Sequence, residues 1–184
     1  MKAKHIKLGV VGLSLLSLVL WCLGFWSPEK LYFRVRHQDV ILHEARRQVL
    51  SPYLLAAVIF TESRFRKMAV SEVGARGLMQ LMPATAEEMA ALERIPNYNV
   101  KMLFEPELNI RLGSRYLSEL LYRFSSTQDA IAAYNAGPGN VIRWKKQNDG
   151  IAYRETRSYV ANVERYQLVF RRLYPEWERS ERDS

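Results

Sequence analysis

The stretch LLAAVIFTESRFRKMAVSEVGARGLMQ, residues 54–80, decides the fold of this chain. It opens as an apolar run in which Leu55, Val58 and Ile59 have helical spacing, and Glu62 follows on the same helix face. A carboxylate on a core-facing stripe is costly unless it is paired or protonated. We therefore expect the pKa of Glu62 to rise from about 4.3 toward about 6 to 7, where a carboxyl group can both donate and recover a proton.

The same carboxylate has a structural alternative. A glutamate at a helix end is commonly solvated or paired, so Glu62 can instead bend out to water or pair with Arg64 or Arg66. Beyond Glu62 the chain turns irregular, and Gly74 and Gly77 punctuate it. The spacing alone leaves both interpretations open.

Helical patterns continue on both sides of this stretch. Ser51 as N-cap and Pro52 as first helical residue start the central helix. The other helices are expected over residues 37–50, 83–94, from 105–106 through at least 121, 129–137 after a cap at 126 or 127, 141–146 and 155–173. Because no alternating run reaches a convincing strand length, the sequence predicts an all-α domain over residues 37–175. A linker at 27–36 precedes this domain, and a charged tail at 176–184 follows it.

The amino-terminal segment predicts a membrane anchor. A basic stretch, MKAKHIK, precedes 19 uncharged residues at 8–26, and such a helix is about 28 Å long, close to one bilayer core. A cleaved signal peptide is the alternative, but the run lacks an A-x-A site, and Trp21 before Cys22 argues against a lipoprotein signal. The positive-inside rule then gives a single-pass protein of the cytoplasmic membrane, with residues 27–184 on the extracytoplasmic (periplasmic or cell-wall) side.

Composition limits the partners and cofactors. The chain has 27 basic and 19 acidic residues and a formal net charge of +8, which suits an anionic partner such as a wall polymer, a membrane surface or nucleic acid. Nucleic acid is not expected, because the bases are scattered and the anchor places the domain outside the cell. The single cysteine, Cys22, permits no disulfide within the chain, and His37 and His43 lack the i, i+4 spacing of a helical zinc pair. We expect no metal and no cofactor.

Five ordered blocks carry a family resemblance. They are the pair Glu62-Ser63, SEVGARGLMQ (71–80), NIRLGSRYL (109–117), AYNAGPGNV (133–141) and ETRSYV (155–160). Together they resemble the catalytic domain of the soluble lytic murein transglycosylase family (SLT domain), and the resemblance covers residues 37–175. It implies a lysozyme-like α-helical fold and an enzyme that cleaves peptidoglycan glycan strands.

The resemblance also implies a mechanism with one glutamate. Glu62 would protonate the glycosidic oxygen of the MurNAc-(β1,4)-GlcNAc bond. It would then take a proton from the muramoyl C6 hydroxyl, which attacks C1 and leaves a 1,6-anhydro end. No water is consumed, so the second carboxylate of ordinary glycosidases is not required. Glu72, the nearest other acid, looks solvent-facing in the sequence.

Substrate-binding residues follow from the same matches. They are Ser71, Met79, Gln80, Tyr134, Asn135, Glu155 and Tyr159. The matches imply that Ser71 hydrogen-bonds the reacting sugar and that the Tyr134 hydroxyl reaches the catalytic carboxyl group. Met79 and Gln80 match the floor of the cleft, although a Leu-Met pair before a proline is also typical of a core.

Two other functions remain open at this point. A goose-type lysozyme would share the fold and hydrolyse the same bond, which would give reducing ends. A wall-binding module would bind glycan without cutting it. The sequence predicts no particular protein partner.

Overall fold

The computed structural model describes residues 28–178, and the chain divides into two compact units at Arg34 and Val35. The described part of the first unit holds one short helix, α2 (Pro28–Tyr32), inside the segment that was expected to be a linker. The predicted anchor at residues 8–26 lies outside the described residues. No helix within residues 28–178 is long and apolar enough to cross a membrane.

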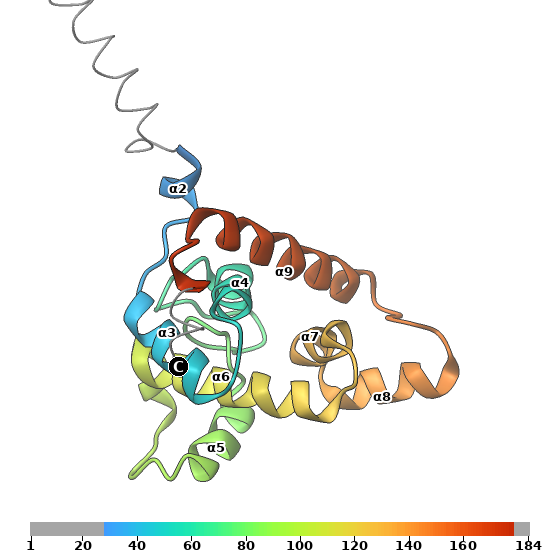
Figure 1. Cartoon of the computed structure of the whole chain (residues 1–184). Helices are drawn as coiled ribbons and strands as arrows, with labels where there is room; N and C mark the ends of the chain where they lie inside the picture. The colour runs from blue at the N-terminus through green and yellow to red at the C-terminus, as the bar shows by residue number, and fades with distance from the viewer. Residues whose placement is uncertain (1–27, 179–184) are drawn as a thin grey trace, which may run out of the picture. The chain divides into compact units, whose positions relative to one another are not determined.

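The second unit is built from helices, as the sequence predicts (Figure 1). Its helices are α3 (Gln38–Arg47), α4 (Pro52–Ser63), α5 (Pro83–Leu92), the 3₁₀-helix η1 (Val100–Phe104), α6 (Pro106–Arg123), α7 (Thr127–Ala136), α8 (Pro138–Gln147) and α9 (Arg154–Leu173). Between residues 28 and 178 the only β pairing consists of two isolated bridges, Val70 with Arg76 and Arg76 with Leu81. The all-α prediction is therefore confirmed for the described domain.

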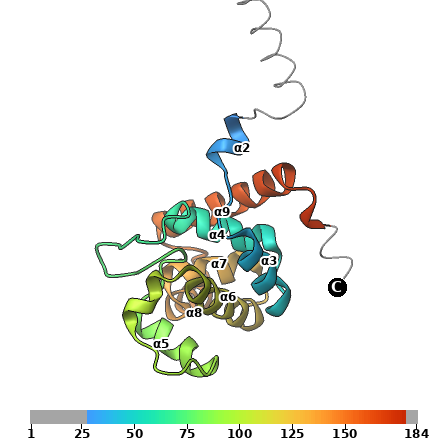
Figure 2. The same cartoon turned by 90° about the vertical axis from the view of Figure 1, so that its left-hand side faces the viewer.

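Helix α4 is the centre of the core. Every residue from Pro52 to Phe60 is buried, so the helix is apolar around its whole circumference, as expected for a helix enclosed by others. Its most extensive packing is against α9, and α3 also packs on it. Figures 1 and 2 show α9 above α4 and α6 below it in both views.

Local sequence signals account for most helix starts. Proline occupies the first turn of α4, α5, α6 and α8, where its fixed φ suits the helix and its missing N–H costs nothing. Ser51 precedes α4 as predicted, but its hydroxyl makes no capping hydrogen bond. Helix α8 begins at Pro138 rather than at the expected Val141, because Gly137 with φ 85° turns the chain within one residue.

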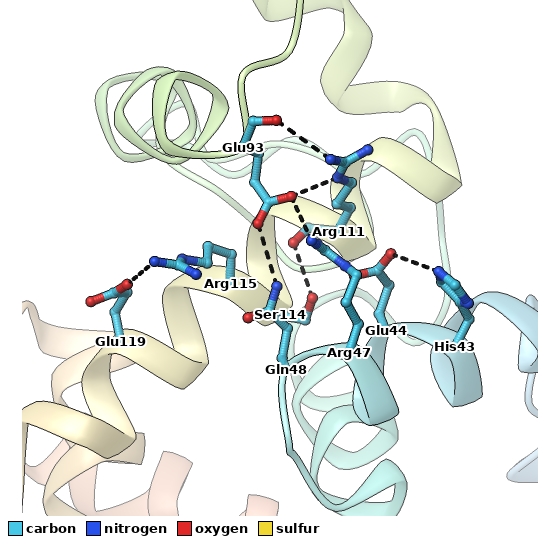
Figure 3. A network of polar contacts seen from close by, with 9 residues as sticks. All are labelled: His43, Glu44, Arg47, Gln48, Glu93, Arg111, Ser114, Arg115 and Glu119. Atoms are coloured by element: carbon cyan, nitrogen blue, oxygen red, sulfur yellow. Dashed lines mark hydrogen bonds and ion pairs between the residues drawn. The ribbon is translucent and has the colours of Figure 1, made fainter. Parts of the chain in front are cut away.

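An ion-pair network holds α3, α5 and α6 together (Figure 3). Glu93, just after α5, accepts hydrogen bonds of 2.7 Å from Arg47 of α3 and 2.7 Å from Arg111 of α6. Gln48 donates to the same carboxylate at 3.4 Å. Burial by itself would raise the pKa of Glu93, but the two arginines outweigh it and lower the pKa.

The carboxyl-terminal boundary differs from the prediction. Trp177, which the sequence assigns to a frayed tail, is only 1% exposed and belongs to the core. Its ring stacks on Tyr174 with a centroid distance of 4.9 Å and on Tyr53 of α4 at 5.4 Å. The prediction was wrong here because Trp177 is a single aromatic residue among charged ones, and one buried residue forms no periodic pattern in the sequence.

Candidate active site

Glu62 stands in the last turn of α4. Leu55, Val58 and Ile59, which share its helix face, are completely buried, as the spacing predicts. The helix ends one residue later, because Arg64 (φ 51°) adopts the left-handed conformation of a helix C-cap. Glu62 is therefore carried by the most buried helix of the domain but lies where that helix meets an irregular loop.

The environment of Glu62 favours its protonated form. Glu62 is half-buried, and burial raises its pKa from 4.5 to about 7. The Tyr159 hydroxyl donates a 2.6 Å hydrogen bond to Glu62 Oε1, which stabilises the charged form and opposes part of that rise. Burial raises the pKa of Tyr159 well above 10, so its phenol stays a donor. Among residues 28–178 Glu62 forms no ion pair, and the expected alternative of pairing with Arg64 or Arg66 is not found.

A pocket of about 500 Å³ opens beside this carboxyl group. It is lined by Glu62, Arg66, Met68, Ala69, Val70, Ser71 and Gln80. Such a volume lies within the range of ligand-binding clefts. Three residues of the sequence prediction, Glu62, Ser71 and Gln80, therefore line one pocket.

The loop between α4 and α5 is shaped by its own polar groups. The Ser71 hydroxyl accepts a 3.0 Å hydrogen bond from the Ala75 amide. The Gln80 side-chain amide donates to the carbonyls of Gly77 (2.8 Å) and Ala69 (3.1 Å). Because both hydrogens of that amide are used, the remaining side-chain group of Gln80 is an acceptor oxygen.

Met79 lies behind the pocket wall, not on it. Its side chain is fully buried, and the space beside it exists because Gly113 of α6 has no Cβ. The Met79 amide donates to Asn109 Oδ1 at 2.8 Å. Its carbonyl accepts a 2.8 Å hydrogen bond from the Tyr134 hydroxyl. Met79 is therefore a core residue, which the sequence offered as the alternative to a place on the floor of the cleft.

The hydroxyl groups of the two predicted tyrosines have partners other than those expected. Tyr134 was expected to reach the catalytic carboxyl group, but its hydroxyl holds the backbone of Met79 instead. Tyr159 of α9, expected only to line the cleft, makes the contact with Glu62. The sequence could not decide between them because the two tyrosines lie on different helices, α7 and α9, and only the packing determines which hydroxyl bonds to the carboxyl group.

Asn135 and Glu155 have different environments. Asn135 Oδ1 accepts a 2.9 Å hydrogen bond from the Thr156 hydroxyl, which ties α7 to the first turn of α9 and so helps to fix Tyr159. Glu155 is exposed in the same first turn and is not part of the pocket lining. Glu72 is also exposed, as expected.

Sequence reasoning did not assign Arg66, Met68, Ala69 or Val70 to the site. These residues lie on an aperiodic loop, and no pattern marks which of its side chains turn toward Glu62. Within residues 28–178 there is no group of three or more His, Cys, Asp or Glu side chains that could hold a metal ion.

The fold and site define a helical domain in which one carboxyl group with a raised pKa lies beside a pocket. The chain belongs to the transglycosylase SLT domain family, whose model matches residues 39–156. This result confirms the family that the five sequence blocks indicate.

Two curated relatives and one solved structure show the extent of the likeness. The soluble lytic murein transglycosylase of Salmonella typhimurium is 35% identical over an alignment 158 positions long, which covers 79% of this chain and 24% of that protein. The membrane-bound lytic murein transglycosylase F of Desulfosudis oleivorans is 37% identical over an alignment 157 positions long, which covers 73% of this chain and 33% of that protein. The structure of an inactive mutant of the lytic transglycosylase Slt from Pseudomonas aeruginosa superposes with a TM-score of 0.72 and 35% identity, and covers 83% of this chain and 26% of that one. The chain thus spans about a quarter to a third of the length of these relatives.

Proposed function

We propose that the protein is a membrane-anchored lytic transglycosylase that cleaves the MurNAc-(β1,4)-GlcNAc bond of peptidoglycan without water. The observation that carries this proposal is Glu62, whose pKa is raised to about 7 by burial and which is the only acid among residues 28–178 that lines its pocket. Family membership and the relatives named lytic murein transglycosylases support it. The likeness to a Slt mutant described as inactive, in which glutamine replaces a glutamate, supports a glutamate as the essential group.

Glu62 acts first as an acid and then as a base. Its proton passes to the glycosidic oxygen as the bond from that oxygen to the muramoyl C1 breaks, and the GlcNAc hydroxyl leaves. The muramoyl C6 hydroxyl forms the new bond to C1 and gives its proton to the Glu62 carboxylate. Glu62 thus regains the proton that it gave to the glycosidic oxygen, and it is ready for another turnover. A pKa near 7 suits both halves of this cycle.

An intramolecular nucleophile explains why one acid is sufficient. Hydrolytic glycosidases place a second carboxylate across the bond to activate water or to attack C1. In the part of the chain that the structure describes, no second carboxylate lines the pocket around Glu62. The C6 hydroxyl belongs to the same sugar as C1, so no translational entropy has to be lost to bring the two together.

The surrounding side chains supply orientation and binding. Tyr159 fixes Glu62 Oε1, which leaves the other carboxyl oxygen to carry the exchanging proton. Ser71 and Gln80 line the same pocket and are assigned to the reacting sugar. Tyr134 and Met79 act from behind by holding the pocket wall. Asn135 acts through α9, and Glu155 is assigned to the outer part of the cleft, where sugars farther along the strand bind.

The apolar segment at residues 8–26 is assigned as the single-pass anchor, with the catalytic domain on the extracytoplasmic side. Its length and the basic residues before it support this assignment, as does a relative named membrane-bound. Fractionation of cells that express the full chain tests it. The domain should remain with the membrane in high salt and should be digested by protease added from the extracytoplasmic side.

Product mass tests the reaction itself. Purified peptidoglycan treated with the protein should release fragments with anhydro ends, which are lighter by one water than hydrolytic products. Glu62→Gln should bind the same glycan and release nothing. Reducing ends would identify a hydrolase, and binding without release by the wild type would identify a wall-binding module; either result overturns the proposal.

A further inference from the structure

The outer face of α9 is a stripe of cationic side chains. Six exposed residues recur along the helix at spacings of three and four, so they lie on one side of it. Four of the six are arginines, and no acid stands among them. At 1.5 Å per residue the stripe is about 27 Å long. We call this set the α9 stripe, and it consists of Arg154, Arg157, Ala161, Arg165, Leu168 and Arg172.

The α9 stripe points away from the core of the domain. The opposite side of α9 is buried and packs on α4 and α7. That buried side carries Tyr159, whose hydroxyl bonds to Glu62. Figures 1 and 2 show α9 above α4 in both views, with α6 on the other side of α4. A ligand on the stripe therefore leaves the contact between Tyr159 and Glu62 intact.

The domain itself supplies little negative charge to the stripe. Among residues 28–178, Arg154, Arg157 and Arg165 take part in no ion pair. Acids gather instead around a pocket on α3, η1 and the start of α6, which is lined by Asp39, Glu44, Glu105 and Glu107. The charge of the domain is therefore unevenly distributed, and the α9 stripe is available to an anionic surface outside the protein.

The course of the chain joins one end of the stripe to the proposed anchor. Val35, the first residue of the second unit, donates a 3.1 Å hydrogen bond from its amide to the Tyr174 hydroxyl, and Tyr174 directly follows α9. The chain therefore enters the domain at the carboxyl-terminal end of the stripe. Residues 27–35 connect this point to the apolar segment and can span at most about 30 Å, at 3.3–3.6 Å per residue. With residues 8–26 in the bilayer, this end of α9 stays near the membrane surface.

We propose that the α9 stripe lies on the membrane surface, where its arginines bind the phosphate groups of anionic phospholipids. This inference rests on the proposed function, because it needs the segment at 8–26 to be the anchor. Guanidinium groups pair well with phosphate oxygens. Leu168 is 67% exposed between Arg165 and Arg172, and an apolar residue in this position can contact the layer beneath the headgroups. Because the anchor keeps the stripe close to lipid, a weak interaction is sufficient, and the membrane is favoured over an anionic wall polymer.

Fluorescence quenching of the full chain in lipid nanodiscs tests this proposal. Leu168→Cys, in a chain that also carries Cys22→Ser, is labelled with a fluorophore and inserted into discs of phosphatidylcholine with or without phosphatidylglycerol. Spin labels on the lipid headgroups quench a fluorophore that lies at the surface. We expect strong quenching in the discs with phosphatidylglycerol, and weaker quenching at high salt, which screens the attraction between arginine and phosphate. The control is Glu107→Cys, exposed in the first turn of α6, and its label should be quenched little in either disc.

A charge variant gives a second measurement. Arg165→Gln should lower the ratio of membrane-bound to unbound domains about fivefold, as expected for one arginine at an anionic surface. Its matched control, Lys101→Gln, removes an exposed positive charge from η1 and should leave that ratio unchanged.

Three results would overturn the inference. They are equal quenching at positions 168 and 107, quenching at 168 that does not depend on phosphatidylglycerol, and a label at 168 that responds to purified peptidoglycan but not to lipid. A chain that inserts into the discs and shows no quenching overturns the inference alone. A chain that fails to insert overturns the anchor of the proposed function and the inference with it.

Discussion

Removing the Tyr159 hydroxyl should move the alkaline limb of the pH–rate profile to higher pH. This hydroxyl donates a 2.6 Å hydrogen bond to Glu62 Oε1 and so favours the carboxylate, while burial favours the neutral acid and holds the pKa at about 7. A hydrogen bond to a charged group contributes about 1.5–3 kcal/mol. At about 1.4 kcal/mol per pKa unit, Tyr159→Phe should raise the pKa of Glu62 by about one to two units.

The assay is the release of anhydro fragments between pH 5 and 10 under kcat conditions. In the wild type the rate should fall as pH rises through about 7, because the proton that Glu62 donates is then lost. In Tyr159→Phe the maximal rate should be lower, because the carboxyl group is less well oriented, and the fall should occur at higher pH.

Tyr134→Phe is the matched control. It removes one hydroxyl from another buried tyrosine, but that hydroxyl is bonded to the Met79 carbonyl and not to Glu62. Its alkaline limb should stay at the wild-type pH, while its free energy of unfolding should fall by about 1–3 kcal/mol, since a buried carbonyl loses its donor. An unchanged limb in Tyr159→Phe, or an equal displacement in both variants, would refute the role assigned to Tyr159.

Three further predictions concern stability. Burial raises the pKa of Glu62 above its unfolded value of 4.5, so the stability that this carboxyl group contributes is fully present below pH 4.5 and declines as pH rises through about 7. In chemical denaturation, the free energy of unfolding of Glu62→Gln should therefore match that of the wild type near pH 4 and exceed it by up to about 3 kcal/mol near pH 8. Glu93 should show the opposite pH dependence of stability, since its arginine partners lower its pKa below 4.5. Glu93→Gln should lower the free energy of unfolding by about 2 kcal/mol at pH 7, and this loss should shrink as pH falls below 4.5. A loss independent of pH would contradict the ion-pair account. Trp177→Ala should cost about 3–5 kcal/mol, whereas Leu168→Ala, at a side chain 67% exposed, should stay within about 0.5 kcal/mol; equal melting temperatures for the two variants would show that Trp177 is not a core residue.

Much of the fold could be read from local signals. Each of three helices begins at a proline, namely Pro52, Pro83 and Pro106. These starts could be predicted because the fixed φ of proline is a local property that does not depend on distant residues. The apolar run to Phe60 predicts a central helix, because only a core can bury a helix that is apolar on all sides. The 3₁₀-helix at 100–104 and helix α2 were missed, since short helices have too few turns to show a period.

The sequence by itself placed Glu62 on the same helix face as Leu55, Val58 and Ile59, because helical spacing is a property of a continuous segment. It left open whether that carboxyl group is buried with a raised pKa or is solvated or paired, and the structure decided for burial. Only the tertiary structure decided which groups meet this acid. Tyr159 reaches it from 97 residues away, and Arg66 shares its pocket from the irregular loop after α4, while the Tyr134 hydroxyl bonds to the Met79 carbonyl. Such contacts depend on the angles at which helices cross and on the course of a loop, and neither leaves a repeat in the sequence from which it could be predicted.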